Sequence, residues 1–218
     1  MTDLLQRCAP GVGMVTMSSI IKVESHGHAF ALADAGPVNL PWSVRKNLVR
    51  SFFPGSVAEA AQLARDLIAR GHTVSLGLAQ VNDRNLPRMG LTIEQVLDPC
   101  TNVATGARIL TDFYGRAVRV YGPGERALRA AISAYNSGDF ERGESNGYVG
   151  LVYSAAGAVP SLSTSPVRGG AGKNSKGSGG GGGGGSPAQR WWNSRAAMLR
   201  EARESPLQDM KVSSAGSE

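Results

Sequence analysis

Glu24 is the side chain with the clearest capacity for acid–base chemistry. It lies three, four and seven residues after Ile21, Ile20 and Met17, so it ends the apolar face of a predicted helix. Apolar surroundings disfavour the charged form of a carboxyl group, and a protonated carboxyl can donate a proton to a glycosidic oxygen. An ordinary helix-end glutamate that points into water has the same spacing. The stripe alone therefore leaves both interpretations open.

Glycosidases that use water normally need a second carboxylate near the acid. The candidates in this sequence are Asp34, Asp83 and Asp112. Asp112 falls in the middle of a predicted helix and is expected to face solvent, whereas Asp34 and Asp83 fall in predicted loops. A single acid suffices when the substrate supplies its own nucleophile. Hydrolysis and a one-carboxylate mechanism are both compatible with these residues.

Metal and nucleotide chemistry find little support in the sequence. No cluster of other His, Cys or carboxylate residues accompanies His26 and His28. We therefore expect these two histidines to lie in a loop and not to form a metal site. Gly11 and Gly13 open no βαβ unit, and the glycine run at 179–185 is not followed by Lys-Ser/Thr. We therefore predict no metal and no cofactor.

Three short segments recur in a recognisable order. Glu24-Ser25 follows the apolar helix, SLGLAQVN occupies residues 75–82, and AYNSG occupies residues 134–138. Together they resemble the soluble lytic transglycosylase family of the lysozyme superfamily. Further segments make the resemblance specific to the VirB1-like members of type IV secretion systems: Cys8-Ala9-Pro10, DPCTN at 98–102 and NGYV at 146–149. The resemblance covers residues 8 to 155.

The resemblance implies a role for each matching residue. Glu24 matches the catalytic acid and base, and Ser75 matches a position close to the substrate-binding floor. Gln80 matches the glutamine that helps to form the sugar-binding groove. Tyr135 matches the tyrosine that reaches the catalytic carboxyl or the substrate, and Asn136 is expected to brace the turn beside it.

The implied reaction is cleavage of the MurNAc-β-1,4-GlcNAc bond of peptidoglycan without water. The C6 hydroxyl of N-acetylmuramic acid attacks its own C1 and leaves a 1,6-anhydro end. The implied purpose is local opening of the cell wall for a secretion or conjugation apparatus. One departure from the family is Ala79, where members usually have Met or Gly. A muramidase assisted by Asp34 or Asp83, and a non-catalytic assembly factor that binds glycan or a pilus component, remain the alternatives.

Helices are the main elements that must position these residues. Apolar residues at helical spacing predict them at 11–24, 56–70, 101–121 and 125–136, with short helices after Thr92 and near Tyr148. Residues 25–55 and 72–90 are rich in Gly and Pro and show no convincing strand alternation. The predicted fold class is therefore mainly α, a lysozyme-like domain.

The charge distribution excludes some partners. Residues 1–159 carry 15 Lys and Arg against 13 Asp and Glu, and no basic block appears, so no nucleic-acid partner is expected. No stretch is long and apolar enough to span a membrane. MTDLLQRCAP lacks the pattern of a signal peptide, so we expect a mature form or a leader outside this chain. The family resemblance implies the periplasm.

Two cysteines, Cys8 and Cys100, lie far apart without a CxxC motif. Spacing alone fits either a disulfide or two separate buried thiols. Cys8 precedes the helix that carries Glu24, and Cys100 precedes the longest helix. We predict that they form a disulfide in protein made in an oxidising compartment.

Composition changes beyond residue 158, which we take as the end of the lysozyme-like domain. Residues 159–187 are dominated by Gly and Ser and predict a disordered linker. Residues 188–218 include an amphipathic stretch with Trp191 and Trp192, followed by a disordered terminus. We predict that this segment contacts components of the type IV secretion system.

Overall fold

The computed structural model describes residues 1–157, apart from the side chains of Trp42 and Lys46. Helices dominate this part of the chain, which confirms the predicted mainly α class. The α-helices are α1 (Thr2–Cys8), α2 (Met14–Ser25), α3 (Trp42–Arg45), α4 (Val57–Ala69), α5 (Leu86–Met89), α6 (Ile93–Leu97), α7 (Pro99–Tyr121), α8 (Glu125–Ser137), α9 (Arg142–Ser145) and α10 (Tyr148–Ala156). The linker and the amphipathic segment predicted at 159–218 lie outside the described residues.

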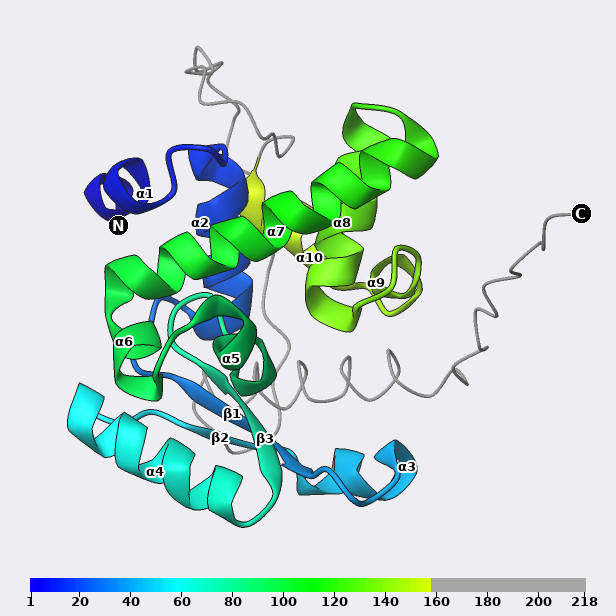
Figure 1. The fold of residues 1–218 in the computed structure, drawn as a ribbon. Coiled ribbons are helices and arrows are strands. Elements are labelled where there is room, and N and C mark those ends of the chain that lie inside the picture. Colours follow the sequence, from blue (N-terminus) through cyan, green and yellow to red (C-terminus); the bar gives the residue numbers. More distant parts are fainter. Residues whose placement is uncertain (158–218) are drawn as a thin grey trace, which may run out of the picture.

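A helical lobe is built around α2, which packs against α10, and around α7, which packs against α8 (Figure 1). The apolar stripe predicted on α2 is fully buried, since Met17, Ile20 and Ile21 are at most 1% exposed. Burial of such side chains is the main stabilising contribution to a core of this kind. The helix that carries Glu24 is therefore fixed at the centre of the lobe.

A four-stranded antiparallel sheet forms the second lobe, with α4 packed against it (Figure 1). Its strands, in the order β2-β1-β3-β4, are β1 (Leu32–Pro37), β2 (Arg50–Phe52), β3 (His72–Leu76) and β4 (Val81–Asn82). The prediction that 25–55 and 72–90 contain no strands was wrong. The strands are two to six residues long, and β1 is buried on both faces, so neither length nor alternation revealed them.

The helices predicted to begin at residue 56 and after Thr92 are capped in different ways. Thr92 and Gln95 form both bonds of a capping box at α6. At α4 the Ser56 side chain accepts from the Glu59 N–H, but the Glu59 carboxylate accepts from Gly55 N and not from Ser56. Helix α1 was not predicted at all.

A disulfide joins Cys8 at the end of α1 to Cys100 at the start of α7, which confirms the predicted pairing. The two Cα atoms lie 5.3 Å apart, as disulfide geometry requires. Among residues 1–157, no helix has the length and hydropathy needed to cross a membrane.

Candidate active site

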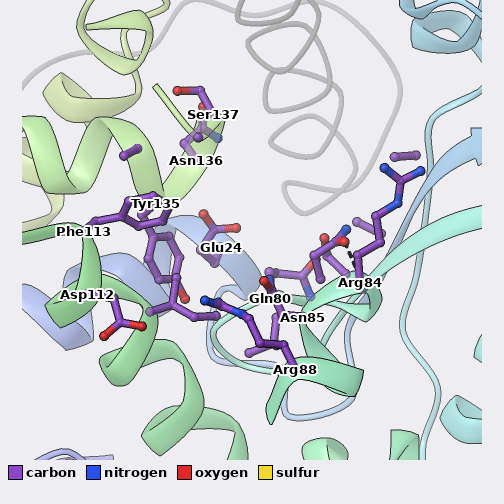
Figure 2. A pocket seen from close by; sticks show the side chains of 18 of the residues that line it. Glu24, Gln80, Arg84, Asn85, Arg88, Asp112, Phe113, Tyr135, Asn136 and Ser137 are labelled. Atoms are coloured by element: carbon purple, nitrogen blue, oxygen red, sulfur yellow. Dashed lines mark hydrogen bonds between the residues drawn. The ribbon is translucent and has the colours of Figure 1, made fainter. Parts of the chain in front are cut away.

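A cleft of about 720 Å³ lies between the two lobes, with Glu24 on its wall. Residues of the sheet, of the 3-10 helix η2 (Asp83–Asn85) and of α5 line one side, and residues of α7 and α8 line the other. Figure 2 shows Glu24 near the middle, between Gln80 and Tyr135. All five residues predicted for catalysis and substrate binding line this cleft: Glu24, Ser75, Gln80, Tyr135 and Asn136.

Glu24 sits in the last turn of α2 and is 2% exposed. The hydroxyl of Tyr148 donates a hydrogen bond to Glu24 Oε1 over 2.6 Å. Tyr148 is itself buried, at the start of α10. A short bond in a buried setting fixes the orientation of the carboxyl group. The acid is therefore held in place by a residue to which sequence analysis had assigned no role.

Behind Tyr148, a chain of hydrogen bonds runs back to the cleft. The buried Asn146 accepts from the backbone N–H of Tyr148 through Oδ1, and its Nδ2 donates to Asn136 Oδ1 over 3.1 Å. Gly147, between Asn146 and Tyr148, has a φ of 82°, which side-chain-bearing residues rarely adopt. Asn136 thus contacts the segment that carries Tyr148, and its expected role in bracing the turn beside it stays a prediction.

The turn between β3 and β4 carries Gln80, whose φ of 49° is unusual for a residue other than glycine. Its side-chain nitrogen donates to the carbonyls of Ala31 and Gly77, which secures this conformation. The turn is tied to α7 by Asn102, which is fully buried. Asn102 accepts from Ala79 N over 2.7 Å and donates to the Leu76 carbonyl over 2.8 Å.

Tyr135 reaches the same turn from α8. Its hydroxyl donates to the carbonyl of Ala79 over 2.7 Å. Gly106 on α7 allows this approach, because a Cβ at that position would lie 2.5 Å from Ala79 Cβ and 2.8 Å from the Tyr135 hydroxyl. Tyr135 therefore links α8 to the floor of the cleft, and its predicted role toward the substrate stays a prediction.

Two of the three carboxylates considered for a water-using mechanism, Asp34 and Asp83, do not face the cleft. Asp34 is fully buried and accepts from Gly36 N, Arg50 and His72. Because side chains alternate along β1 and its neighbours Ala33 and Ala35 line the cleft, Asp34 points to the opposite face. Asp83 accepts from Thr73 and from the backbone of Val74, also away from the cleft.

Asp112 was expected to face solvent, and it does so inside the cleft. It shares the cleft with four arginines, which are exposed: Arg84, Arg88, Arg116 and Arg119. Sequence analysis singled out none of these cations. Arg116 and Arg119 follow Asp112 at helical spacing on α7, so a search for charged residues on one helix face would have found them.

Tyr148, Asn146 and Asn102 were also missed as members of the site. All three lie inside motifs that pointed to the family, DPCTN and NGYV, so the motifs contained the signal. Their roles depend on contacts across 10 to 124 residues of sequence. No local pattern predicts such contacts.

Comparison with known proteins gives a consistent family. The model of the transglycosylase SLT domain matches residues 6–151. The chain is 43% identical over 141 residues to the type IV secretion system protein virB1 of Brucella suis, which covers 64% of this chain and 55% of that protein. It is 34% identical over 166 residues to protein virB1 of Agrobacterium fabrum, which covers 75% of this chain and 62% of that protein. No solved structure gives a significant match.

The chain thus spans little more than half the length of the Brucella relative, so the comparison concerns the matched domain. The matched residues include the whole described lining of the cleft, from Glu24 to Gly138, and also Tyr148. The family resemblance noted in the sequence is confirmed. This chain belongs to the transglycosylase SLT domain family.

Proposed function

We propose that this protein cleaves the MurNAc-β-1,4-GlcNAc bond of peptidoglycan without water and leaves a 1,6-anhydro end. The observation that carries the proposal is the contrast between the two carboxyl groups of the described cleft. Glu24 is 2% exposed and hydrogen-bonded by Tyr148, whereas Asp112 is exposed. One buried acid suits a reaction in which the same carboxyl group donates a proton to the leaving oxygen and later accepts one from the attacking hydroxyl.

In the proposed reaction Glu24 acts first as an acid and then as a base. Its proton passes to the glycosidic oxygen as the bond from C1 to that oxygen breaks. The C6 hydroxyl oxygen of N-acetylmuramic acid then bonds to C1, and its proton passes to the Glu24 carboxylate. Glu24 ends the cycle protonated, and no water is consumed.

The names of the relatives support a role in type IV secretion, where the protein would open the cell wall locally for the apparatus. The Cys8–Cys100 disulfide supports an oxidising compartment such as the periplasm. A second candidate is a hydrolytic muramidase, which would use Asp112 to activate water, because Asp112 is the other carboxylate on the cleft.

Mass spectrometry of digested sacculi tests the proposal. Wild-type protein is expected to release glycan ends lighter by one water than the products of a hydrolase. Glu24→Gln is expected to lower the rate roughly a hundredfold or more. Asp112→Asn is the matched comparison and is expected to keep both the rate, within about threefold, and the cyclised end.

Three outcomes would contradict the proposal. Products with a water added across the bond would establish hydrolysis. An Asp112→Asn protein as inactive as Glu24→Gln would indicate a two-carboxylate mechanism. A folded Glu24→Gln protein that still clears peptidoglycan would favour a non-catalytic role for this carboxyl group.

A further inference from the structure

We infer that the arginines of the cleft bind the carboxylate groups of the peptide stems on the glycan strand, so that the protein prefers strands that carry anionic stems. The inference rests on the proposed function, since it concerns the same cleft. It adds a second ligand class, a peptide carboxylate, to the sugars. The cleft arginines are defined as Arg84, Arg88, Arg116 and Arg119.

Positive charge is concentrated in the cleft and not over the whole domain. Residues 1–159 are nearly balanced, with 15 basic and 13 acidic residues. The described lining of the cleft nevertheless holds four guanidinium groups against two carboxyl groups, Glu24 and Asp112. A cleft with this excess focuses a positive potential on its contents.

The cleft arginines also differ from four of the arginines described elsewhere in the chain. Arg7, Arg50, Arg65 and Arg129 each form a salt bridge with a carboxylate of the protein. Within residues 1–157 none of the cleft arginines does so. Arg116 lies against the rings of Phe113 and Phe140, which hold its position. The anion-binding capacity of these side chains is therefore available to a ligand.

The arginines lie on both sides of the catalytic acid. Arg84 belongs to η2 and Arg88 to α5, whereas Arg116 and Arg119 lie on α7. Figure 2 shows Arg88 extending toward the middle of the cleft on the side of Asp112, and Arg84 extending the other way. A strand passing Glu24 would therefore meet guanidinium groups along its path.

GlcNAc is uncharged, and the lactyl carboxyl of a stem-bearing MurNAc is taken up in the amide bond to the stem, so the sugars of such a strand offer these groups no ionic partner. The peptide stems of peptidoglycan carry free carboxylates, and a guanidinium can bind a carboxylate through two parallel hydrogen bonds. Exposed pairs of this kind contribute modestly one by one and weaken with salt. Several together are expected to set a preference between ligands.

The inference is tested by measuring the affinity of the Glu24→Gln protein, which is expected not to cleave its substrate, for three ligands. The ligands are a tetrasaccharide with peptide stems, the same compound with its stem carboxylates amidated, and chitohexaose. We expect the free stems to bind about tenfold more tightly than the amidated ones at low salt. Adding Arg88→Gln or Arg119→Gln should weaken binding of the free stems about threefold to fivefold, with chitohexaose unchanged.

Arg108→Gln is the matched control, since Arg108 is exposed on α7 outside the cleft. It should leave all three affinities unchanged. Equal binding of free and amidated stems, or an equal loss for chitohexaose in the arginine variants, would overturn the inference. Because the measurement involves no cleavage, failure of the transglycosylase reaction would appear separately, in the products of the wild-type protein.

Discussion

At the scale of single residues, Glu24 could be predicted and its hydrogen-bond partner could not. An apolar stripe and a family motif both point to Glu24. Tyr148 lies 124 residues later, and its hydroxyl meets Glu24 only because α10 packs against α2. Similarly, sequence motifs pointed to Ser75, Gln80 and Tyr135. They did not show that Asn102 secures the β3–β4 turn that carries Gln80. Contacts between residues that lie far apart in the sequence cannot be predicted until the fold is known.

Replacement of Tyr148 by Phe removes the hydroxyl that orients Glu24 while keeping the buried ring. We expect kcat to fall about tenfold to a hundredfold, because a hydrogen bond to an ionisable group contributes about 1.5–3 kcal/mol. Tyr153→Phe, on the same helix and outside the described cleft lining, serves as the control and should keep its turnover. Unchanged kcat in a folded Tyr148→Phe protein would show that the bond is structural only.

At the scale of elements, long helices were predicted well and short strands were missed. Helices α7 and α8 have strong amphipathic periodicity, which tertiary packing reinforces. The strands are too short for a pattern, and they are stabilised by non-local bonds such as those of Asn102 to the β3–β4 turn. The turn that carries Gln80 therefore depends on α7, a helix that is distant from it in the sequence.

Replacement of Asn102 by Ala tests this dependence. The change leaves the Ala79 N–H and the carbonyls of Leu76 and Val96 without their buried partner. We expect the free energy of unfolding to fall by about 3 kcal/mol, measured by urea denaturation. Thr111→Ala, at an exposed position of the same helix, should change it by less than about 0.5 kcal/mol. Equal values for the two variants would mean that the turn is held by other contacts.

At the scale of the whole molecule, the Cys8–Cys100 disulfide joins the N-terminal helix to the longest one across 92 residues of sequence. In the chain-entropy model, a loop of this length stabilises the folded state by about 4.5 kcal/mol. The Cys8→Ser/Cys100→Ser protein should therefore unfold at a lower denaturant concentration, by circular dichroism, while its cyclised product stays the same. An unchanged midpoint would indicate that helix packing alone secures the N-terminus.

The same bond gives the molecule a closed covalent ring. The ring runs from residue 8 to residue 100 and contains Glu24, Gln80 and the exposed segment around Val44 and Leu48. A protease that cuts the backbone at that segment leaves both pieces attached through sulfur. The nicked enzyme would keep Glu24 and Gln80 in one molecule, and the two pieces would separate on a denaturing gel only after a thiol is added. A break in the part of the chain between Glu24 and Gln80 would therefore leave these two residues of the cleft covalently linked.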